Sequence, residues 1–151
     1  MDAYEFLSSQ TTRQIDKLFA AARALPEERL NWKPSENSRS AVDMLQEVAT
    51  ALGRFADAWN RRKIEWDQEK FMSWQQERAK LTSLDELEAR TRQETEDFLQ
   101  TIKSIDASQW TEAVEMPFPG EFTVADVLSY HLWNMSYHEG QIYYIGTLDK
   151  N

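Results

Sequence analysis

The chain has 151 residues, no cysteine and a formal net charge of -9 at pH 7. This length is enough for one domain with a buried core, so we expect a single domain over residues 1–151. The absence of cysteine excludes disulfides and thiol nucleophiles. The acidic balance disfavours nucleic acid and anionic membranes as partners, because phosphates are bound through lysine and arginine. With no signal-peptide pattern and no apolar run of about 18 residues, we expect a soluble cytoplasmic protein.

Four segments have apolar residues at the three- and four-residue spacing that predicts amphipathic helices. The first covers residues 3–25 and ends before Pro26. The second begins near residue 40 and continues to residue 61 or beyond, and the third covers residues 82–105. The fourth covers residues 123–148, with Thr123 as a natural N-cap. Because only four glycines and four prolines are present, an all-α fold is favoured, and four long helices predict a four-helix bundle.

The second predicted helix has one apolar face but no obvious end. Its face consists of Val42, Leu45, Ala49, Leu52, Ala56 and Trp59. Residues 62–79 contain further aromatic residues at irregular spacing, so either a bend or a short separate helix fits them. The preceding loop, residues 26–40, carries Leu30 and Trp32, which we expect to pack on the bundle. Its serines and asparagine offer acceptors for the start of the second helix.

Polar side chains recur on one face of the fourth predicted helix. Two apolar residues flank them, and the face consists of Val127, His131, Asn134, His138, Gln141 and Ile145. In a four-helix bundle such a face can point inward, toward functional groups on other helices. Imidazole and amide oxygen both bind first-row metals, so a carboxylate from a facing helix would complete a metal site. The alternative is that solvent or neighbouring side chains satisfy these groups.

Two segments resemble the DinB-like (DinB/YfiT) superfamily of four-helix bundles. Residues 137–142, YHEGQI, resemble its Y-H-x-G-Q-[IL] signature near the end of the chain. Residues 30–40, LNWKPSENSRS, resemble its loop between the first two helices, where W-x-P and R-S recur. The two matches are far apart in sequence and agree with the four predicted helices. The resemblance therefore covers essentially the whole chain and implies a DinB-like four-helix bundle.

The resemblance also implies a position for a metal site. Many members hold a divalent metal on three histidines, one from the second helix and two from an H-x-x-x-H on the fourth. His138 matches the last histidine, Asn134 stands four residues earlier, and residues 40–48 place Glu47 at the remaining position. The implied ligands of Ni, Zn or Fe are thus Glu47, Asn134 and His138, with His131 as a less favoured substitute. Two of three histidines are changed, which weakens the donor set.

Each of these residues also has a purely structural interpretation. Glu47 fits a boundary carboxylate paired with a lysine or arginine, and His131 fits a buried histidine bonded to a neighbour. Gly140 would allow a close approach between helices, and Gln141 can bond a neighbouring helix or loop.

Two functions follow from these interpretations. In the first, a metal acts as a Lewis acid in a transferase or hydrolase that acts on a small molecule, with thiol transfer as one form of that activity. In the second, the chain is a metal-free bundle that binds a small ligand or serves in a stress response without catalysis. The surplus of aromatic residues favours a homodimer.

Overall fold

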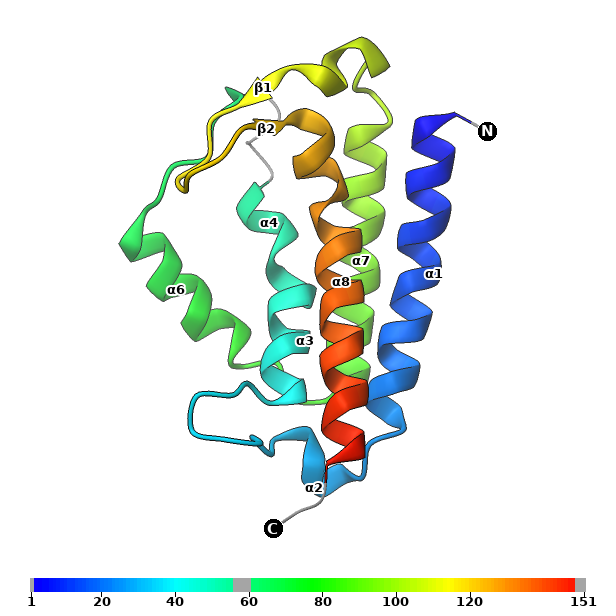
Figure 1. Cartoon of the computed structure of the whole chain (residues 1–151), viewed down its shortest axis with the longest axis vertical. Coiled ribbons are helices and arrows are strands. Elements are labelled where there is room, and N and C mark those ends of the chain that lie inside the picture. The colour runs from blue at the N-terminus through cyan, green and yellow to red at the C-terminus, as the bar shows by residue number, and fades with distance from the viewer. Residues whose placement is uncertain (1, 56–60, 149–151) are drawn as a thin grey trace.

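The computed structural model describes residues 2–55 and 61–148, and its main body is a bundle of long helices. The bundle consists of α1 (Ala3–Arg23), α3 (Ala41–Thr50), α7 (Leu84–Ile102) and α8 (Val124–Thr147). Figure 1 shows these helices side by side, with the start of α1 and the end of α8 at opposite ends of the bundle. The predicted all-α four-helix bundle is confirmed.

The starts of three long helices follow from local capping. Asp2, Ser83 and Thr123 each accept a hydrogen bond from a backbone N–H in the first turn of α1, α7 and α8. In each case an acidic residue in the third helical position bonds back to the cap, which completes a capping box. The N-cap predicted at Thr123 is therefore confirmed.

The core lies between α1, α3, α7 and α8 and falls into two clusters of buried apolar side chains. Near the C-terminal ends of α1 and α8 the first cluster contains Leu18, Leu45 and Met135, all fully buried. At the other end, the second contains Phe98 and Leu128. Full burial of one such side chain contributes about 1.5–3 kcal/mol, so the two clusters supply most of the driving force for packing.

The second predicted helix is shorter than the sequence indicates. The α3 helix ends at Thr50, and a short helix α4 (Leu52–Phe55) follows it. The predicted core residues Ala56 and Trp59 lie outside the described residues. After the gap the chain is not a continuation of α3, because Arg62 adopts a positive φ of 52°.

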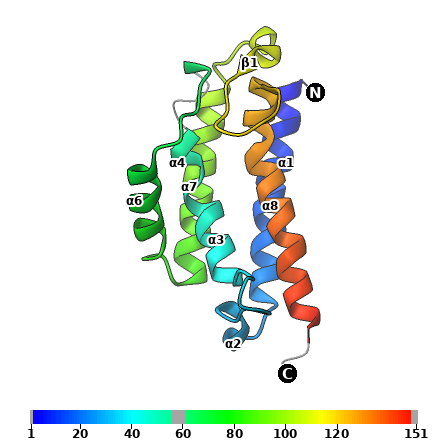
Figure 2. The same ribbon diagram turned by 60° about the vertical axis from the view of Figure 1, so that its left-hand side comes forward.

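Residues 62–79 form an extended stretch and a separate helix, α6 (Gln68–Arg78). The Ile64 N–H donates to the Glu115 carbonyl at 2.8 Å, and the Glu115 N–H donates to the Arg62 carbonyl at 2.9 Å. These bonds hold the extended stretch against the connection between α7 and α8. Figure 2 shows α6 outside the bundle, beyond α3 and α7. The indole N–H of Trp74 fastens α6 to α3 by donating to Thr50 Oγ1 at 2.9 Å.

The two long connections also contain local structure. Between α1 and α3, a short helix α2 (Glu27–Leu30) precedes a loop, and Leu30 and Trp32 pack on the core as predicted. The third predicted helix, α7, ends at Ile102 rather than near residue 105. The 3-10 helix η1 (Ala107–Thr111) and the antiparallel strands β1 (Ala113–Val114) and β2 (Phe122–Thr123) then lead to α8.

No helix in the described part of the chain is long and apolar enough to cross a membrane.

Two glycines are expected to respond to alanine substitution in opposite ways. Gly120 lies between β1 and β2 with a φ of +138°, and an added Cβ would lie 2.7 Å from the Phe122 ring. Gly120→Ala should lower the free energy of unfolding by about 1–3 kcal/mol. Gly140 lies inside α8 with no atom within 4 Å of an added Cβ, so Gly140→Ala should raise stability by about 0.5–1 kcal/mol.

Urea unfolding followed by circular dichroism measures both changes, and each variant serves as the other's control. A Gly120→Ala protein as stable as the wild type would contradict this conformation of the connection.

Candidate functional site

Glu47 on α3 and His138 on α8 face each other across the bundle. His138 Nε2 lies 3.5 Å from Glu47 Oε1, although 91 residues separate the two in sequence. His138 is 2% exposed, and Glu47 retains partial access to solvent. The sequence-based expectation that these two side chains approach each other is therefore consistent with the geometry.

An arginine that precedes α3 binds the other oxygen of Glu47. Arg39 Nη1 lies 2.5 Å from Glu47 Oε2, and Arg39 Nε donates to Asp43 Oδ2. Ser40 between them is the N-cap of α3, so the guanidinium lies along the first turns of the helix. Asp43 and Glu47, one turn apart in α3, share one helix face, and Arg39 reaches both from before the N-cap. Glu47 is thus a boundary carboxylate paired with arginine.

A second arginine, from α6, extends this ion-pair network. Arg78 Nη2 donates to Asp43 Oδ1 at 2.6 Å, and Arg78 Nη1 lies 3.9 Å from Glu47 Oε2. Its guanidinium also lies over the Trp74 ring, 4.5 Å from the centroid. A cation over an indole face is stabilised electrostatically, so Trp74 helps hold the arginine in this position.

These partners keep Glu47 ionised. Burial alone would raise the pKa of Glu47, but the hydrogen bond with His138 and the charge of Arg39 outweigh it and lower that pKa from 4.5 to about 2. Glu47 is therefore a carboxylate at any physiological pH. Its negative charge is compensated within the protein, chiefly by Arg39.

The imidazole of His138 is oriented by the next turn of its own helix. His138 Nδ1 lies 2.7 Å from Gln141 Oε1, within hydrogen-bond distance. Nε2 is left directed at Glu47. Gln141 thus sets the orientation of His138, while Gly140 makes no close helix contact, contrary to the packing role considered for it.

Asn134, one turn before His138, is buried at 2% exposure. Its Nδ2 has no hydrogen-bond partner among the described residues. An unsatisfied buried amide costs roughly 1–3 kcal/mol, so it identifies a position where the polar face of α8 is incompletely satisfied.

His131 faces a different helix. Its Nε2 lies 2.9 Å from Thr95 Oγ1 on α7, and the Thr95 hydroxyl itself donates to the Thr91 carbonyl. Thr95 therefore accepts from Nε2–H, and the ring packs edge-on near Phe98. Burial lowers the pKa of His131 to about 4 and keeps it neutral. His131 is a buried histidine bonded to α7 and does not join Glu47 and His138.

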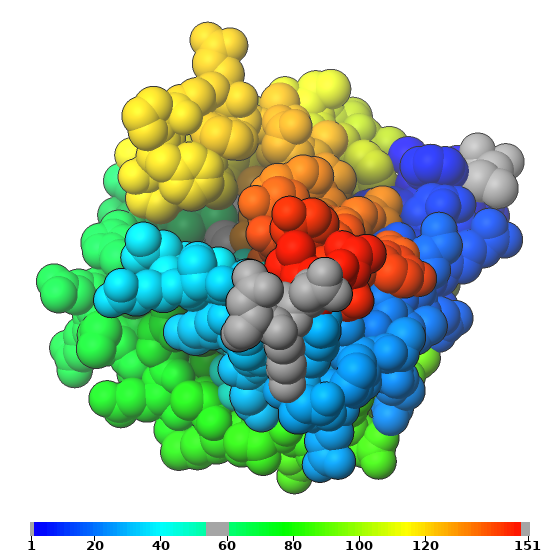
Figure 3. Space-filling view, turned by 60° about the horizontal axis from the view of Figure 1, so that its bottom comes forward, coloured from blue at the N-terminus to red at the C-terminus, as the bar shows by residue number. Residues whose placement is uncertain are grey.

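Two cavities reach this centre from the surface. One has a volume of about 560 Å³ and lies between the 34–39 loop and α8, where Arg39, Gly140 and Gln141 contribute to its wall. The other, about 280 Å³, lies between α3 and α6 and exposes Glu47 beside Trp74 and Arg78. Figure 3 shows the surface hollowed between the 31–40 loop in cyan, α8 in orange and the connection around β1 and β2 in yellow.

The donor set around His138 does not fit a first-row divalent cation. One oxygen of Glu47 is already bound to Arg39. The guanidinium groups of Arg39 and Arg78 are both positive and would repel a metal ion. No group of three or more histidine, aspartate and glutamate residues in the described ranges is arranged to hold a metal. The assignment of a metal to Glu47, Asn134 and His138 stays a prediction, which the experiment proposed below tests.

Comparison with known proteins agrees with this architecture. The model of the DinB family matches residues 3–145, so the chain belongs to the DinB family. Among solved structures, the crystal structure of a DinB-like protein, YjoA from Bacillus subtilis, matches with a TM-score of 0.61 and 16% sequence identity. The match covers 92% of this chain and 88% of that chain. A search of curated proteins found no significant match.

Sequence reasoning identified Glu47, His138 and Gln141 but missed the two arginines that neutralise Glu47. Arg39 lies only eight residues before Glu47, which made it a candidate partner, but it precedes the N-cap Ser40 and is not placed by helix periodicity. Arg78 left no signal in the sequence. Its role depends on how α6 folds back against α3, and the irregular spacing of residues 62–79 did not predict that arrangement.

The buried, neutral His131 predicts a pH dependence of stability. The unfolded chain takes up a proton at this imidazole near pH 6.5, whereas the folded protein does so only near its lowered pKa of about 4. Unfolding therefore binds a proton between these values, and stability should fall by about 3 kcal/mol as the pH decreases through that window. Urea unfolding at pH 7.5, 6.5, 5.5 and 4.5 measures the slope.

His131→Gln, which keeps a donor for Thr95, should flatten this slope. Glu88→Gln is the control, because hydrogen bonds from Arg23 and Arg92 lower the pKa of Glu88, so that group loses its stabilising effect only below its ordinary pKa of 4.5. Its slope above pH 4.5 should match the wild type. An unchanged slope in His131→Gln would contradict the neutral buried state.

Proposed function

We propose that this DinB-family chain binds a small molecule at the centre formed by Arg39, Glu47 and His138, and that it does so without a resident metal. The observation that carries the proposal is the 2.5 Å contact between Arg39 Nη1 and Glu47 Oε2. A guanidinium at this distance neutralises the carboxylate that a metal would otherwise need.

The 560 Å³ cavity between the 34–39 loop and α8 supports a small-molecule ligand. Its volume lies in the usual range of about 300–1,000 Å³ for small-molecule sites. Arg39 and Gln141 belong both to its wall and to the polar centre, so a ligand there can reach the groups that hold Glu47 and His138. Gly140 adds no side chain and keeps the wall open.

The chemistry of the wall indicates the class of ligand. Arg39, Asn37 and Ser38 provide hydrogen-bond donors, while Met44 and Ile145 provide apolar surface. Arg39 is the only charged side chain among the described residues that line this cavity, and it is positive. A small organic molecule with a carbonyl or carboxylate on an apolar body matches this combination.

The alternative is the metal-dependent transferase or hydrolase, with Ni, Zn or Fe on Glu47, Asn134 and His138. One specific feature supports it: Asn134 is buried one turn before His138, and no hydrogen bond of its amide nitrogen to a described residue fixes the side chain, so its oxygen can turn toward the centre. A metal ion could bind Glu47 only if Arg39 moved away from it. The two proposals therefore differ in whether Arg39 or a metal ion is the partner of Glu47.

Metal analysis of protein purified without a chelator or an immobilised metal separates them. We expect substoichiometric Ni, Zn and Fe in the wild type, and a melting temperature that neither EDTA nor added Zn²⁺ changes. Stoichiometric metal in the wild type, lost in His138→Ala with little change in helical signal, would establish the metal site and overturn the proposal.

A restored histidine triad provides the matched positive control. The triple variant Arg39→Met, Glu47→His and Asn134→His removes the competing cation and supplies two imidazoles beside His138. It should bind Zn²⁺ and melt at a higher temperature when Zn²⁺ is present. Glu47→His with Asn134→His alone should bind more weakly, because Arg39 remains. Equal binding by both variants would show that Arg39 does not exclude the metal.

A further inference from the structure

The structure assigns a second binding site, for a small organic cation, to the aromatic cavity between residues 64–66, the β1–β2 connection and the first half of α8. This cavity has a volume of about 750 Å³. Neither Arg39, Glu47 nor His138 lines it, and it meets the smaller cleft beside Glu47 only at Tyr130. The inference therefore does not depend on the function proposed for the polar centre.

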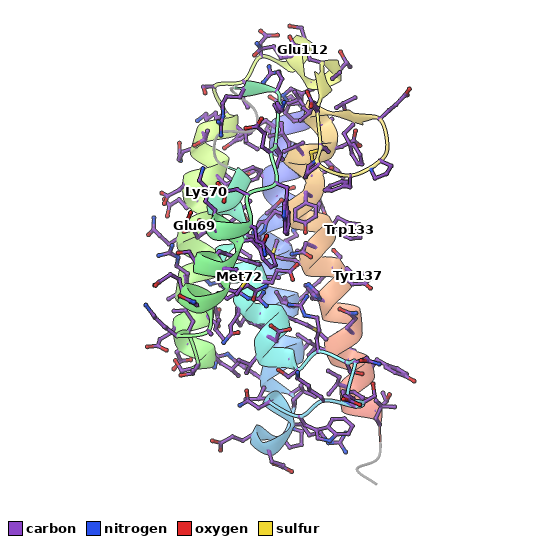
Figure 4. The ribbon with its side chains drawn as sticks, turned by 90° about the vertical axis from the view of Figure 1, so that its left-hand side faces the viewer. Glu69, Lys70, Met72, Glu112, Trp133 and Tyr137 are labelled. Carbon is purple, nitrogen blue, oxygen red and sulfur yellow. The ribbon has the colours of Figure 1, made fainter. Side chains whose placement is uncertain are left out.

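Five of the eleven residues that line the cavity are aromatic. They come from three separate segments and are Trp66, Phe118, Phe122, Tyr130 and Trp133. Three of them are unusually exposed for large apolar side chains: Trp66 at 60%, Phe118 at 51% and Trp133 at 57%. Exposed rings that gather around one hollow, rather than scatter singly, indicate a binding surface. Figure 4 shows Trp133 on α8, across from the α6 residues Glu69, Lys70 and Met72.

The rings lie against one another in edge-to-face and tilted pairs. Phe118 and Phe122 meet edge to face, with centroids 5.3 Å apart and an interplanar angle of 90°. Tyr130 and Trp133 are tilted at 41°, with centroids 5.7 Å apart. The negative face of an aromatic ring attracts ammonium groups, and recognition of quaternary ammonium by several rings is a recurrent use of this attraction.

The charged groups of the cavity are both acidic. Glu65 and Asp126 line it, and no lysine or arginine does so among the described residues. The Thr123 backbone N–H and hydroxyl both donate to Asp126 Oδ2, and these bonds lower the pKa of Asp126. Asp126 is therefore held ionised at the edge of the aromatic wall.

Lys63 neutralises this acidity only in part. Lys63 Nζ lies 3.2 Å from Glu65 and 3.3 Å from Glu115, so one ammonium is shared by two carboxylates. The net charge of the whole chain, -9, adds to the negative potential. Aromatic faces together with surplus carboxylate favour a cation over a neutral molecule and repel an anion.

The backbone holds the walls in place before a ligand arrives. The Ile64 N–H and the Glu115 N–H bond residues 62–64 to residue 115, and β1 pairs with β2. Gly120, whose φ is +138°, lets the chain turn so that Phe122 packs beneath it. A cavity built in this way requires little ordering of side chains on binding, which improves affinity.

Binding of benzyltrimethylammonium tests the assignment, with two comparators of related shape: uncharged neopentylbenzene and anionic benzenesulfonate. The indole N–H resonances of Trp66 and Trp133, observed by NMR in ¹⁵N-labelled full-length protein, report occupancy of the cavity. We expect the cation to bind at least about tenfold more tightly than neopentylbenzene. Benzenesulfonate should not shift these resonances.

A pair of double variants separates the role of the carboxylates from the loss of net charge. Glu65→Gln with Asp126→Asn should raise the Kd of the cation about threefold to tenfold and leave neopentylbenzene unaffected. The control is Glu36→Gln with Glu86→Gln, which removes the same two charges at the other end of the molecule. Glu86 closes the capping box of α7 as Asp126 closes that of α8. The Kd of this control variant for the cation should stay within about twofold of the wild-type value.

Trp133→Leu provides a test that does not alter any charge or cap. This substitution should weaken binding of the cation more than binding of neopentylbenzene, because an aliphatic side chain keeps apolar surface but lacks a ring face.

Three results would overturn the assignment. They are equal affinity for the cation and neopentylbenzene, equal affinity of the two double variants for the cation, and binding that vanishes as light scattering shows a dimer forming. The last result would mean that a second copy of the chain covers these rings.

Discussion

Glu47 places a partly buried carboxylate where α3 meets α8, and this negative charge has to be compensated. The positions of the surrounding loop and helices depend on the side chains that compensate it. Arg39 supplies the closest positive charge, and His138 approaches the other oxygen. Arg39 and Arg78 also share Asp43, so one network joins the 34–39 loop, α3, α6 and α8. Removing one partner from a buried pair costs about 3–5 kcal/mol, somewhat less where the pair is partly exposed.

The polar face of α8 shows how differently one helix stripe can be used. His131 is desolvated, bonded to Thr95 and neutral, so it serves the core. His138, two turns later, is oriented by Gln141 toward a carboxylate. Asn134 lies between them in sequence, with an unbonded amide nitrogen among the described residues. Contacts with charged groups of other helices are therefore found at the His138 end of this helix face. Periodicity alone could not distinguish the roles of the two histidines.

The sequence predicted what local interactions determine. The helix starts at Ser83 and Thr123 follow from capping, and the burial of His131, Asn134 and His138 follows from their spacing. What it could not predict depends on contacts between distant segments. The end of α3 at Thr50 and the separate α6 follow from backbone bonds to residue 115 and from the indole of Trp74. The same contacts bring Arg78 to Asp43, which explains why its role was missed.

Segments outside the four-helix bundle form one side of two of the cavities. Residues 64–66, α6 and the β1–β2 connection stand outside the bundle and line these two clefts, together with Glu47 on α3 and Tyr130 on α8. A change of the residue at position 47 would alter the charge at the centre but would not remove those outer walls. The pairing of Glu47 with Arg39 joins α3 to the loop that precedes it, and Arg78 joins α3 to α6 through Asp43. The shape of the clefts therefore depends on the outer segments as much as on the polar centre.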